Sequence, residues 1–222
     1  MKKNVVVLNF KVYAESSGEY GLRLARAADS VARQMGKSVV VVPPVPEVAI
    51  VSKEVSVPVF AQAADANRAG AFTGSITLES LKEAGAKGTL VNHSEKRVKP
   101  EDVEAVVNRA GELGLETIVC AATVEEGARL AAFGPTAVAV EPPELIGSGI
   151  SVSTARPEIV SDSVREIKAV GENVLVLVGA GVSTPGDVAK AVELGADGVL
   201  LASAFVKASD PEGLLKAMVK EF

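Results

Sequence analysis

The chain has 222 residues, a formal net charge of −5 and 48% hydrophobic residues, with few aromatics and no tryptophan. The negative charge argues against a nucleic-acid-binding protein, which needs a basic face, and no apolar run approaches the ~18 residues of a membrane span. A single cysteine excludes an internal disulfide and fits a reducing compartment. The N-terminus runs into a strand without a signal-peptide pattern. We therefore expect a cytoplasmic protein with neither a nucleic-acid nor a membrane partner.

Eight short runs rich in Val, Ile and Leu recur along the chain, and continuous apolar runs are typical of strands in a buried parallel sheet. They are Val5–Leu8, Ser38–Val42, Val57–Ala61, Thr89–Val91, Glu116–Cys120, Thr136–Val140, Val174–Val178 and Val199–Leu201. Stretches with helical periodicity separate them, and the repeat of roughly 28 residues is the size of one compact strand–helix step. No segment resembles a linker, so we expect a single domain over residues 1–222.

Residues that begin and end helices support this division. Thr123-Val124-Glu125-Glu126 predicts a capping box, and Pro100 and Pro185 suit first helical positions. Four glycines suit the ends of helices: Gly36, Gly85, Gly114 and Gly195. Cys120 closes an apolar run, which favours a buried structural thiol over a reactive one.

One short segment occurs twice. Residues 85–91 read GAKGTLV and residues 195–201 read GADGVLL, an offset of 110 residues that is close to four strand–helix units. The two copies fall on the fourth and eighth predicted strands. This pattern predicts an α/β fold, a closed (β/α)8 barrel of two equivalent halves. An open doubly wound sheet also alternates strands and helices, but it needs an excess of elements at one edge, which the sequence lacks.

Polar side chains follow the first predicted strand at its C-terminal end, the edge where parallel α/β folds bind ligands. A lysine in the position of Lys11 is, taken alone, more often a solvated end charge. The functional alternative is an ammonium that faces a phosphate or a developing oxyanion. Asn9 points to the same side as Lys11 because side chains alternate along a strand.

His93, the only histidine, follows the fourth strand within the polar run Asn92–Arg97. A lone histidine is more often structural, and the charged residues after it are by default a solvated face. Its position at a strand end favours a general acid or electrophile. A single imidazole disfavours a zinc site, so we predict no bound metal.

Glu141 follows the sixth strand and precedes Pro142 and Pro143. One interpretation is a rigid strand exit with an exposed carboxylate. The glycines of Gly147-Ser148-Gly149 favour a second, in which Glu141 is a base beside a lid hinged between Pro142 and this segment. A cation, an imidazole and a carboxylate at one edge predict proton transfer on an anionic substrate.

Small residues follow the last two strands, at Gly179–Ser183 and Ala202–Ala204. They let backbone N–H groups approach an anion, and helix N-termini add a positive dipole. Barrel enzymes often bind phosphate at these two loops. We therefore predict a phosphate subsite there.

Together these motifs resemble those of the triosephosphate isomerase family. The resemblance is carried by Asn9–Lys11, Asn92–Arg97 and Ala139–Gly149, while Gln62–Asp65 and Ala71–Gly74 resemble the exit of strand three and the dimer loop. The match runs in order from residue 4 to beyond residue 205, and the short chain resembles the archaeal branch. It implies a TIM barrel that interconverts D-glyceraldehyde 3-phosphate and dihydroxyacetone phosphate through an enediolate, in glycolysis and gluconeogenesis, without a cofactor.

The resemblance also implies roles for individual residues. Glu141 would be the base and His93 the electrophile, while Lys11 and Asn9 would hold substrate oxygens and phosphate. Glu95 would support Lys11. Backbone N–H groups that would bind the phosphate belong to Ile146, Gly147, Gly181, Ala202 and Ser203. The lid tip lacks the family's tryptophan, and Ala202-Ser203 replaces its glycine pair.

The loop over residues 66–75 is long for a strand–helix connection and carries Phe72 with few apolar neighbours. The resemblance implies that this loop inserts beside Lys11 of a neighbouring subunit and brings Thr73 near the catalytic residues. We therefore expect a homo-oligomer, either a dimer or, given the compact chain, a tetramer.

Two other functions use a similar pocket. A sugar-phosphate epimerase would show carboxylate and histidine metal ligands on several strands, which a chain with one histidine does not offer. A non-catalytic sugar-phosphate sensor would have no need to combine Lys11, His93 and Glu141.

Overall fold

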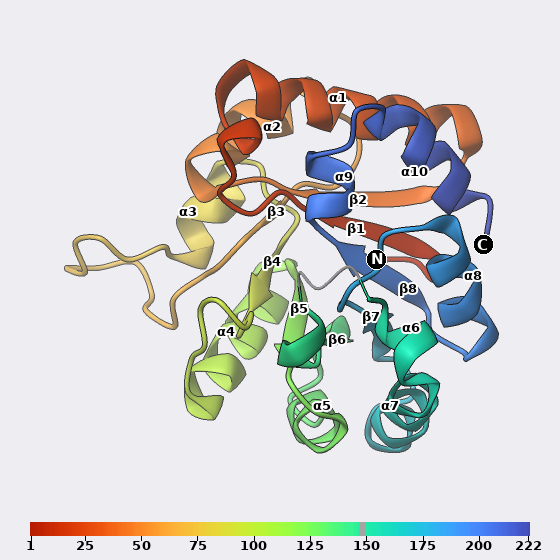
Figure 1. Ribbon diagram of the computed structural model, residues 1–222. Coiled ribbons are helices and arrows are strands. Elements are labelled where there is room, and N and C mark those ends of the chain that lie inside the picture. Colours follow the sequence, from red (N-terminus) through yellow and green to blue (C-terminus); the bar gives the residue numbers. More distant parts are fainter. Residues whose placement is uncertain (147–149) are drawn as a thin grey trace.

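The computed structural model describes residues 1–146 and 150–222, and its framework is a parallel sheet of eight strands (Figure 1). The strands are β1 (Val5–Asn9), β2 (Ser38–Val42), β3 (Phe60–Ala61), β4 (Gly88–Val91), β5 (Glu116–Ala121), β6 (Ala137–Val140), β7 (Leu175–Val178) and β8 (Gly198–Leu201). Their order is β2-β1-β8-β7-β6-β5-β4-β3. A parallel bridge between Val41 and Val59 joins the two ends of this order, so the sheet closes on itself. The predicted (β/α)8 barrel is confirmed.

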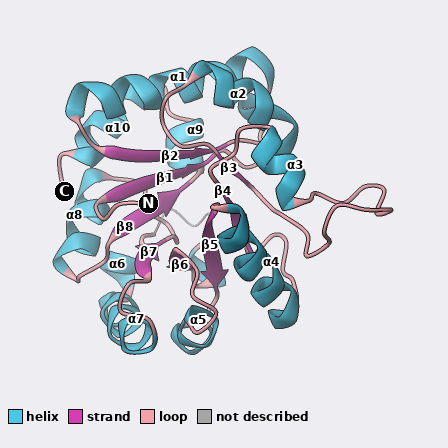
Figure 2. Ribbon diagram, turned by 180° about the vertical axis from the view of Figure 1, so that it is seen from behind, coloured by secondary structure: helices cyan, strands magenta, loops and turns pink. Residues whose placement is uncertain are grey.

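Helices surround the strands (Figure 2). They are α1 (Gly18–Met35), α2 (Val48–Glu54), α3 (Leu78–Glu83), α4 (Pro100–Leu113), α5 (Val124–Ala131), α6 (Val152–Ala155), α7 (Pro157–Val170), α8 (Pro185–Glu193), α9 (Ser203–Val206) and α10 (Pro211–Val219). Three short 3₁₀ turns are η1 (Ala14–Ser16), η2 (Val45–Glu47) and η3 (Pro143–Leu145). Within the described ranges, every helix is too short or too polar to cross a membrane.

Seven strands lie within one residue of their predicted bounds, and the third is shorter than predicted. Pro58 interrupts the run Val57–Ala61 because it has no N–H to donate to a neighbouring strand. Its carbonyl still accepts a hydrogen bond from the Val41 N–H at 3.1 Å. Closure of the barrel therefore uses the isolated bridge between Val41 and Val59, to which this bond belongs, instead of a full ladder.

The predicted capping box at the start of α5 forms only in part. The Thr123 hydroxyl accepts a hydrogen bond from the Glu126 N–H at 3.1 Å. The Glu126 carboxylate does not return to the Thr123 N–H. It accepts from the Ala122 N–H at 2.7 Å and forms an ion pair with Arg97. One carboxylate oxygen thus binds the backbone one residue before the expected donor, and the other pairs with Arg97.

Other predicted helix boundaries are confirmed. Pro100 and Pro185 are the first residues of α4 and α8. The four glycines assigned to helix ends all have left-handed backbone angles, with φ between 63° and 94°, which residues with a Cβ rarely adopt.

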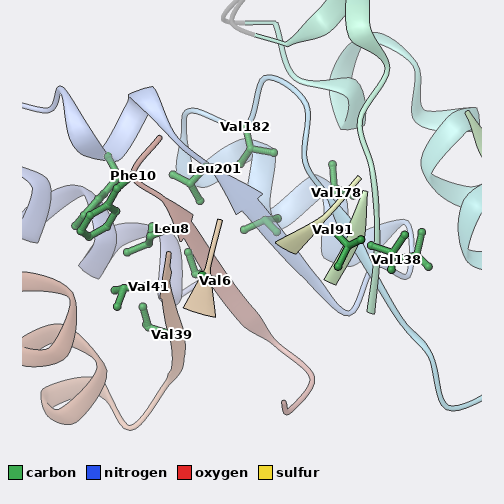
Figure 3. Packing of buried hydrophobic residues seen from close by; sticks show 14 of the residues in the cluster. Val6, Leu8, Phe10, Val39, Val41, Val91, Val138, Val178, Val182 and Leu201 are labelled. Atoms are coloured by element: carbon green, nitrogen blue, oxygen red, sulfur yellow. The ribbon is translucent and has the colours of Figure 1, made fainter. Parts of the chain in front are cut away.

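Side chains alternate along each strand between two buried clusters. One fills the barrel interior and consists of Val5, Val7, Val40, Val42, Phe60, Leu90, Ile118, Cys120, Ala137, Ala139, Leu175, Leu177 and Leu200. The other lies between the sheet and the helices and includes Val6, Leu8 and Val138 (Figure 3). Because the period is two, Asn9 after Val7 and Glu141 after Ala139 face the interior side at the C-terminal edge. The alternation of side chains along β1 and β6 thus brings Asn9 and Glu141 to the same end of the barrel interior.

Candidate active site

A cavity of about 290 Å³ opens at the C-terminal edge of the barrel. Eight residues predicted from the sequence line it: Asn9, Lys11, His93, Glu141, Ile146, Gly181, Ala202 and Ser203. Glu95 lies just outside, against Lys11. Gly147 falls outside the described residues, and Thr73 lies on the exposed loop 66–75, away from the cavities of its own chain.

Lys11 adopts an unusual backbone conformation after β1. Its φ is +49°, in the left-handed region, which costs an L-residue about 1 kcal/mol. Two neighbours stabilise the turn: the Asn9 Oδ1 accepts the Lys11 N–H at 3.0 Å, and the Gln62 Nε2 donates to the Lys11 carbonyl at 2.8 Å. The Lys11 ammonium then lies 2.8 Å from the Glu95 carboxylate. A carboxamide on β1 therefore fixes the position of the cation.

His93 enters the cavity because the residue before it breaks the strand. Asn92 has a φ of +62°, and its side chain donates to the Cys120 carbonyl at 2.9 Å and accepts from the Val98 N–H at 3.1 Å. This turn interrupts the alternation of β4. The residue that follows, His93, is 6% exposed.

Hydrogen bonding selects one tautomer of His93. Its Nδ1 accepts the Glu95 N–H at 3.2 Å, so the neutral ring carries its proton on Nε2. Burial lowers the pKa of His93, and the Lys11 ammonium lowers it further, against the opposing effect of Glu95. The ring is therefore neutral at neutral pH and presents an N–H donor.

Glu141 is a buried carboxylate, 3% exposed. Burial raises its pKa from the usual 4.5 to about 7. The Oε2 atom has no hydrogen-bond partner among the described residues and lies 3.8 Å from the His93 Nε2. A carboxylate with a pKa near 7 and a free oxygen has the properties of a general base at neutral pH.

Two neighbours make room for Glu141 and moderate its pKa. A Cβ at position 179 would lie 2.5 Å from the Glu141 Cγ, so only glycine fits there. The Cys120 thiol donates a hydrogen bond to Glu141 and lowers the pKa of that carboxyl. Cys120 is buried as predicted, and burial beside Glu141 raises the pKa of the thiol well above its usual range.

The loops after β7 and β8 supply backbone donors at the far end of the cavity. In the described part of the chain, the N–H groups of Gly181 and Ser203 donate to no protein acceptor, and Ser203 is the first residue of α9. The neighbouring Ser183 N–H is already used, because it donates to Asp187 at 3.0 Å. The donors therefore cluster at Gly181 and Ser203.

Comparisons with known proteins address the identity of this site. The family model described as triosephosphate isomerase matches residues 4–221. The chain belongs to the triosephosphate isomerase family. It is 49% identical to the triosephosphate isomerase of Methanothermus fervidus over the full length of both chains. It is 48% identical to that of Archaeoglobus fulgidus, over 98% of each chain, and 45% identical to that of Methanocaldococcus jannaschii, over 97% of this chain and 99% of the relative.

Membership of the triosephosphate isomerase family gives the chain its reaction class. The chain is an isomerase that interconverts D-glyceraldehyde 3-phosphate and dihydroxyacetone phosphate. The matched family model names this isomerase, not the epimerase or the non-catalytic sensor considered from the sequence.

The predicted lid region departs from the family's tryptophan-containing tip. Pro143–Leu145 form the 3₁₀ turn η3, in which Leu145 is buried. The Glu144 carboxylate lies 3.0 Å from Arg156, just before α7. The second expected hinge, at 147–149, lies outside the described residues, so the lid remains a prediction.

Sequence reasoning missed two residues that line the cavity, Tyr13 and Lys207, whereas Ser183 belongs to the predicted phosphate segment Gly179–Ser183. Tyr13 lies two residues after Lys11, and Lys207 lies one helical turn after Ser203. These spacings are a signal that could have found them. The contact between Cys120 and Glu141 had no such signal, since it depends on how β5 and β6 pair.

We predict that Cys120→Ala moves the acid limb of the pH profile upward. Without the thiol hydrogen bond that lowers the pKa of Glu141, this pKa rises above its wild-type value of about 7. A base is active only when deprotonated. As the pH is lowered, kcat/KM of the variant should therefore begin to fall at a higher pH than kcat/KM of the wild type. The measurement is kcat/KM against pH for both proteins with one substrate, so that substrate ionisation cancels. Cys120→Ser, which keeps a donor, should shift less; an unmoved limb in Cys120→Ala would contradict the assignment.

We also predict that the buried base reduces stability as the pH rises. Between pH 4.5 and about 7 the unfolded carboxyl is ionised, whereas the folded Glu141 still holds its proton. Stability linked to this proton is therefore present at low pH and lost as the pH rises through 7, by up to about 3 kcal/mol. Glu141→Gln cannot ionise. The unfolding free energy of the variant minus that of the wild type should grow between pH 4.5 and about 7 and stay constant above pH 7. A difference that does not change with pH would contradict the prediction.

Proposed function

We propose that Glu141, His93 and Lys11 perform the isomerisation in this cavity. The observation that carries the proposal is the meeting of a buried carboxylate with a pKa of about 7 and a neutral imidazole, whose Nε2 lies 3.8 Å from the carboxylate Oε2. Proton transfer between adjacent carbons needs one base that can act on both and a donor for the intervening oxygens. Glu141 and His93 match these two requirements.

In the proposed mechanism Glu141 removes the proton from the carbon next to the carbonyl. The C–H electron pair forms the carbon–carbon double bond of the enediolate, and the carbonyl π electrons move to oxygen. The His93 Nε2–H donates a hydrogen bond to this oxygen, and the Lys11 ammonium stabilises its charge. His93 then passes a proton between the two oxygens: its Nε2–H protonates the former carbonyl oxygen, and Nε2 takes the proton of the neighbouring hydroxyl. That second oxygen re-forms a carbonyl, and the carbon–carbon double-bond pair takes the proton back from Glu141 at the other carbon. The oxidation state of the molecule is unchanged, so the reaction calls for no redox cofactor.

The phosphate is proposed to lie at the Gly181 and Ser203 end of the cavity. Unused N–H groups at these two residues support this placement, with Ile146, Gly147 and Ala202 completing the backbone donors expected from the family. Lys11 and Asn9 would bridge the phosphate and the reacting carbons. Binding at a distance from the chemistry supplies free energy for orientation.

We further propose that residues 1–222 act as one catalytic domain in cytoplasmic glycolysis and gluconeogenesis, without a metal. The assignment rests on the family and on the three side chains above, which balance the reaction by themselves.

A homo-oligomer, dimer or tetramer, is the proposed working form. The loop 66–75 stands away from the barrel (Figure 1), and Phe72 at its tip is 51% exposed. A second cavity of about 320 Å³ lies on the other side of Lys11 and His93, and Val12 at its edge is 81% exposed. A loop of one chain that fills this cavity of another would cover both apolar surfaces and carry Thr73 to the catalytic residues.

Replacement of the base tests the mechanism. We expect Glu141→Ala to lower kcat by about 10²–10⁴-fold, the usual contribution of a positioned base, while inorganic phosphate still competes for the cavity. The assay starts from glyceraldehyde 3-phosphate and follows the reduction of the dihydroxyacetone phosphate that is formed. An activity within about tenfold of wild type would exclude Glu141 as the base, and an inactive wild type would overturn the proposed function itself.

Disruption of the loop tests the assembly. Phe72→Asp places a charge on the apolar tip and should yield smaller, less active particles in sedimentation at low protein concentration. Tyr20→Asp is the matched control, because Tyr20 is an aromatic on α1 that is 63% exposed and lines neither cavity. Full activity in a wild-type monomer would show that the site is complete in one chain.

A further inference from the structure

Lys207 lines the active-site cavity but has no part in the mechanism above. It follows α9, and its N–H donates to the Ser203 carbonyl at 2.9 Å. Residues four apart on a helical turn lie on the same face. Lys207 is therefore placed directly behind Ser203, at the end of the cavity that carries the unused backbone donors.

An aromatic ring holds the Lys207 side chain. Its ammonium lies 4.3 Å from the centre of the Tyr13 ring, within the range of a cation–π contact. Tyr13 follows Lys11 in the loop after β1 and lines the same cavity. The loop after β1 and helix α9 also pack against each other directly, because Phe10 stacks on Phe205 with ring centres 6.1 Å apart. The position of the Lys207 charge is thus determined by packing on both sides.

Lys207 differs from Lys11, the other cation in the cavity, in whether a carboxylate neutralises its charge. Lys11 forms an ion pair with Glu95 at 2.8 Å, whereas Lys207 has no acidic partner in the described part of the chain. Ionised Glu141 adds a negative charge, and the whole protein carries −5. Without Lys207 the lining would hold Lys11 against ionised Glu141, a net charge of zero, and Glu95 beside Lys11 would bring the total to −1, toward a phosphate that carries close to two negative charges at neutral pH.

We propose that Lys207, positioned by Tyr13, is a specificity-determining residue that attracts the phosphate dianion of the substrate to the Ser203 end of the cavity. The inference rests on the proposed function of this site and names a side chain for its phosphate selectivity. An aromatic ring suits this task because it orients an ammonium without neutralising it, whereas a carboxylate partner would cancel the charge that the substrate needs.

The size of the effect follows from Coulomb's law. One exposed charge about 6 Å from a dianion in water corresponds to roughly tenfold in affinity, and screening by salt reduces this to about threefold. A lysine that only covers Tyr13 as a solvated surface residue would contribute no such factor. The two interpretations therefore differ in a measurable binding constant.

Lys207→Met removes the charge and keeps an unbranched apolar side chain against Tyr13. We expect KM for glyceraldehyde 3-phosphate and Ki for inorganic phosphate to rise together by about three- to tenfold at low salt, with kcat changed by less than about twofold. The increase should shrink as salt is added. Lys207→Arg should restore both constants, since it keeps the charge and the ring contact.

Two controls make the result specific. Lys220→Met removes the same charge from the end of α10, outside the cavity, and should leave KM and Ki unchanged. Tyr13→Leu should reproduce part of the Lys207→Met effect and add little to it in the double variant, whereas Tyr13→Phe keeps the ring and should have little effect. If Lys220→Met raised KM and Ki as much as Lys207→Met does, the effect would come from the net charge of the protein, and the assignment of Lys207 would be wrong.

The outcomes distinguish this inference from the proposed function. A wild type that isomerises the substrate, together with Lys207→Met at unchanged KM and phosphate Ki, would overturn the role of Lys207 alone. A wild type without isomerase activity that still binds phosphate less tightly after Lys207→Met would overturn the reaction and keep the anion site. Conversion of unphosphorylated glyceraldehyde should be insensitive to Lys207→Met; a parallel loss there would mean that the residue acts on the chemistry and not on the phosphate.

Discussion

The burial of one carboxylate, Glu141, is the constraint on which the site depends. In water this group would be ionised and weakly basic, and burial raises its pKa to about 7. The barrel provides the burial because its strands are apolar on both faces and Glu141 continues the inward row of β6. Its surroundings are adapted to it, with a glycine at 179 in place of a side chain and a thiol from β5 as a donor. In the proposed mechanism the basicity of Glu141 would thus be gained at the expense of stability.

Two left-handed residues show a second compromise between fold and function. Lys11 and Asn92 both leave the regular strand geometry at the C-terminal edge. Each conformation is unfavourable alone, and each is held by an amide side chain, that of Asn9 for Lys11 and that of Asn92 for itself. The turn at Asn92 points the His93 imidazole into the cavity, whereas a continued β4 would have pointed it outward. The rigid barrel below supplies the stability that permits this.

Sequence alone predicted the barrel and most of the cavity lining, because both depend on local patterns. Apolar runs mark the strands, and a polar residue directly after such a run reaches the C-terminal edge whatever the details of packing. One error had a local cause that was visible in the sequence, because Pro58 lies inside the run predicted as the third strand and shortens β3. Other predictions were incomplete where a distant residue takes part, as where Arg97 pairs with Glu126. Contacts between strands, such as that of Cys120 with Glu141, are fixed by the register of the closed sheet, which no short motif encodes.

The arrangement of the two cavities connects assembly with chemistry. Asn9, Lys11 and His93 form the wall common to the cavity with Glu141 and to the cavity beside Val12. A segment packed into the second cavity would contact the far side of the residues proposed to act in the first. It would exclude water from the Lys11–Glu95 pair and so strengthen the electrostatic interactions of the ammonium. Gln62, which lines the second cavity, donates a hydrogen bond that supports the strained turn at Lys11. A segment of another chain bound there would therefore act on the geometry of Lys11, one of the residues proposed to react.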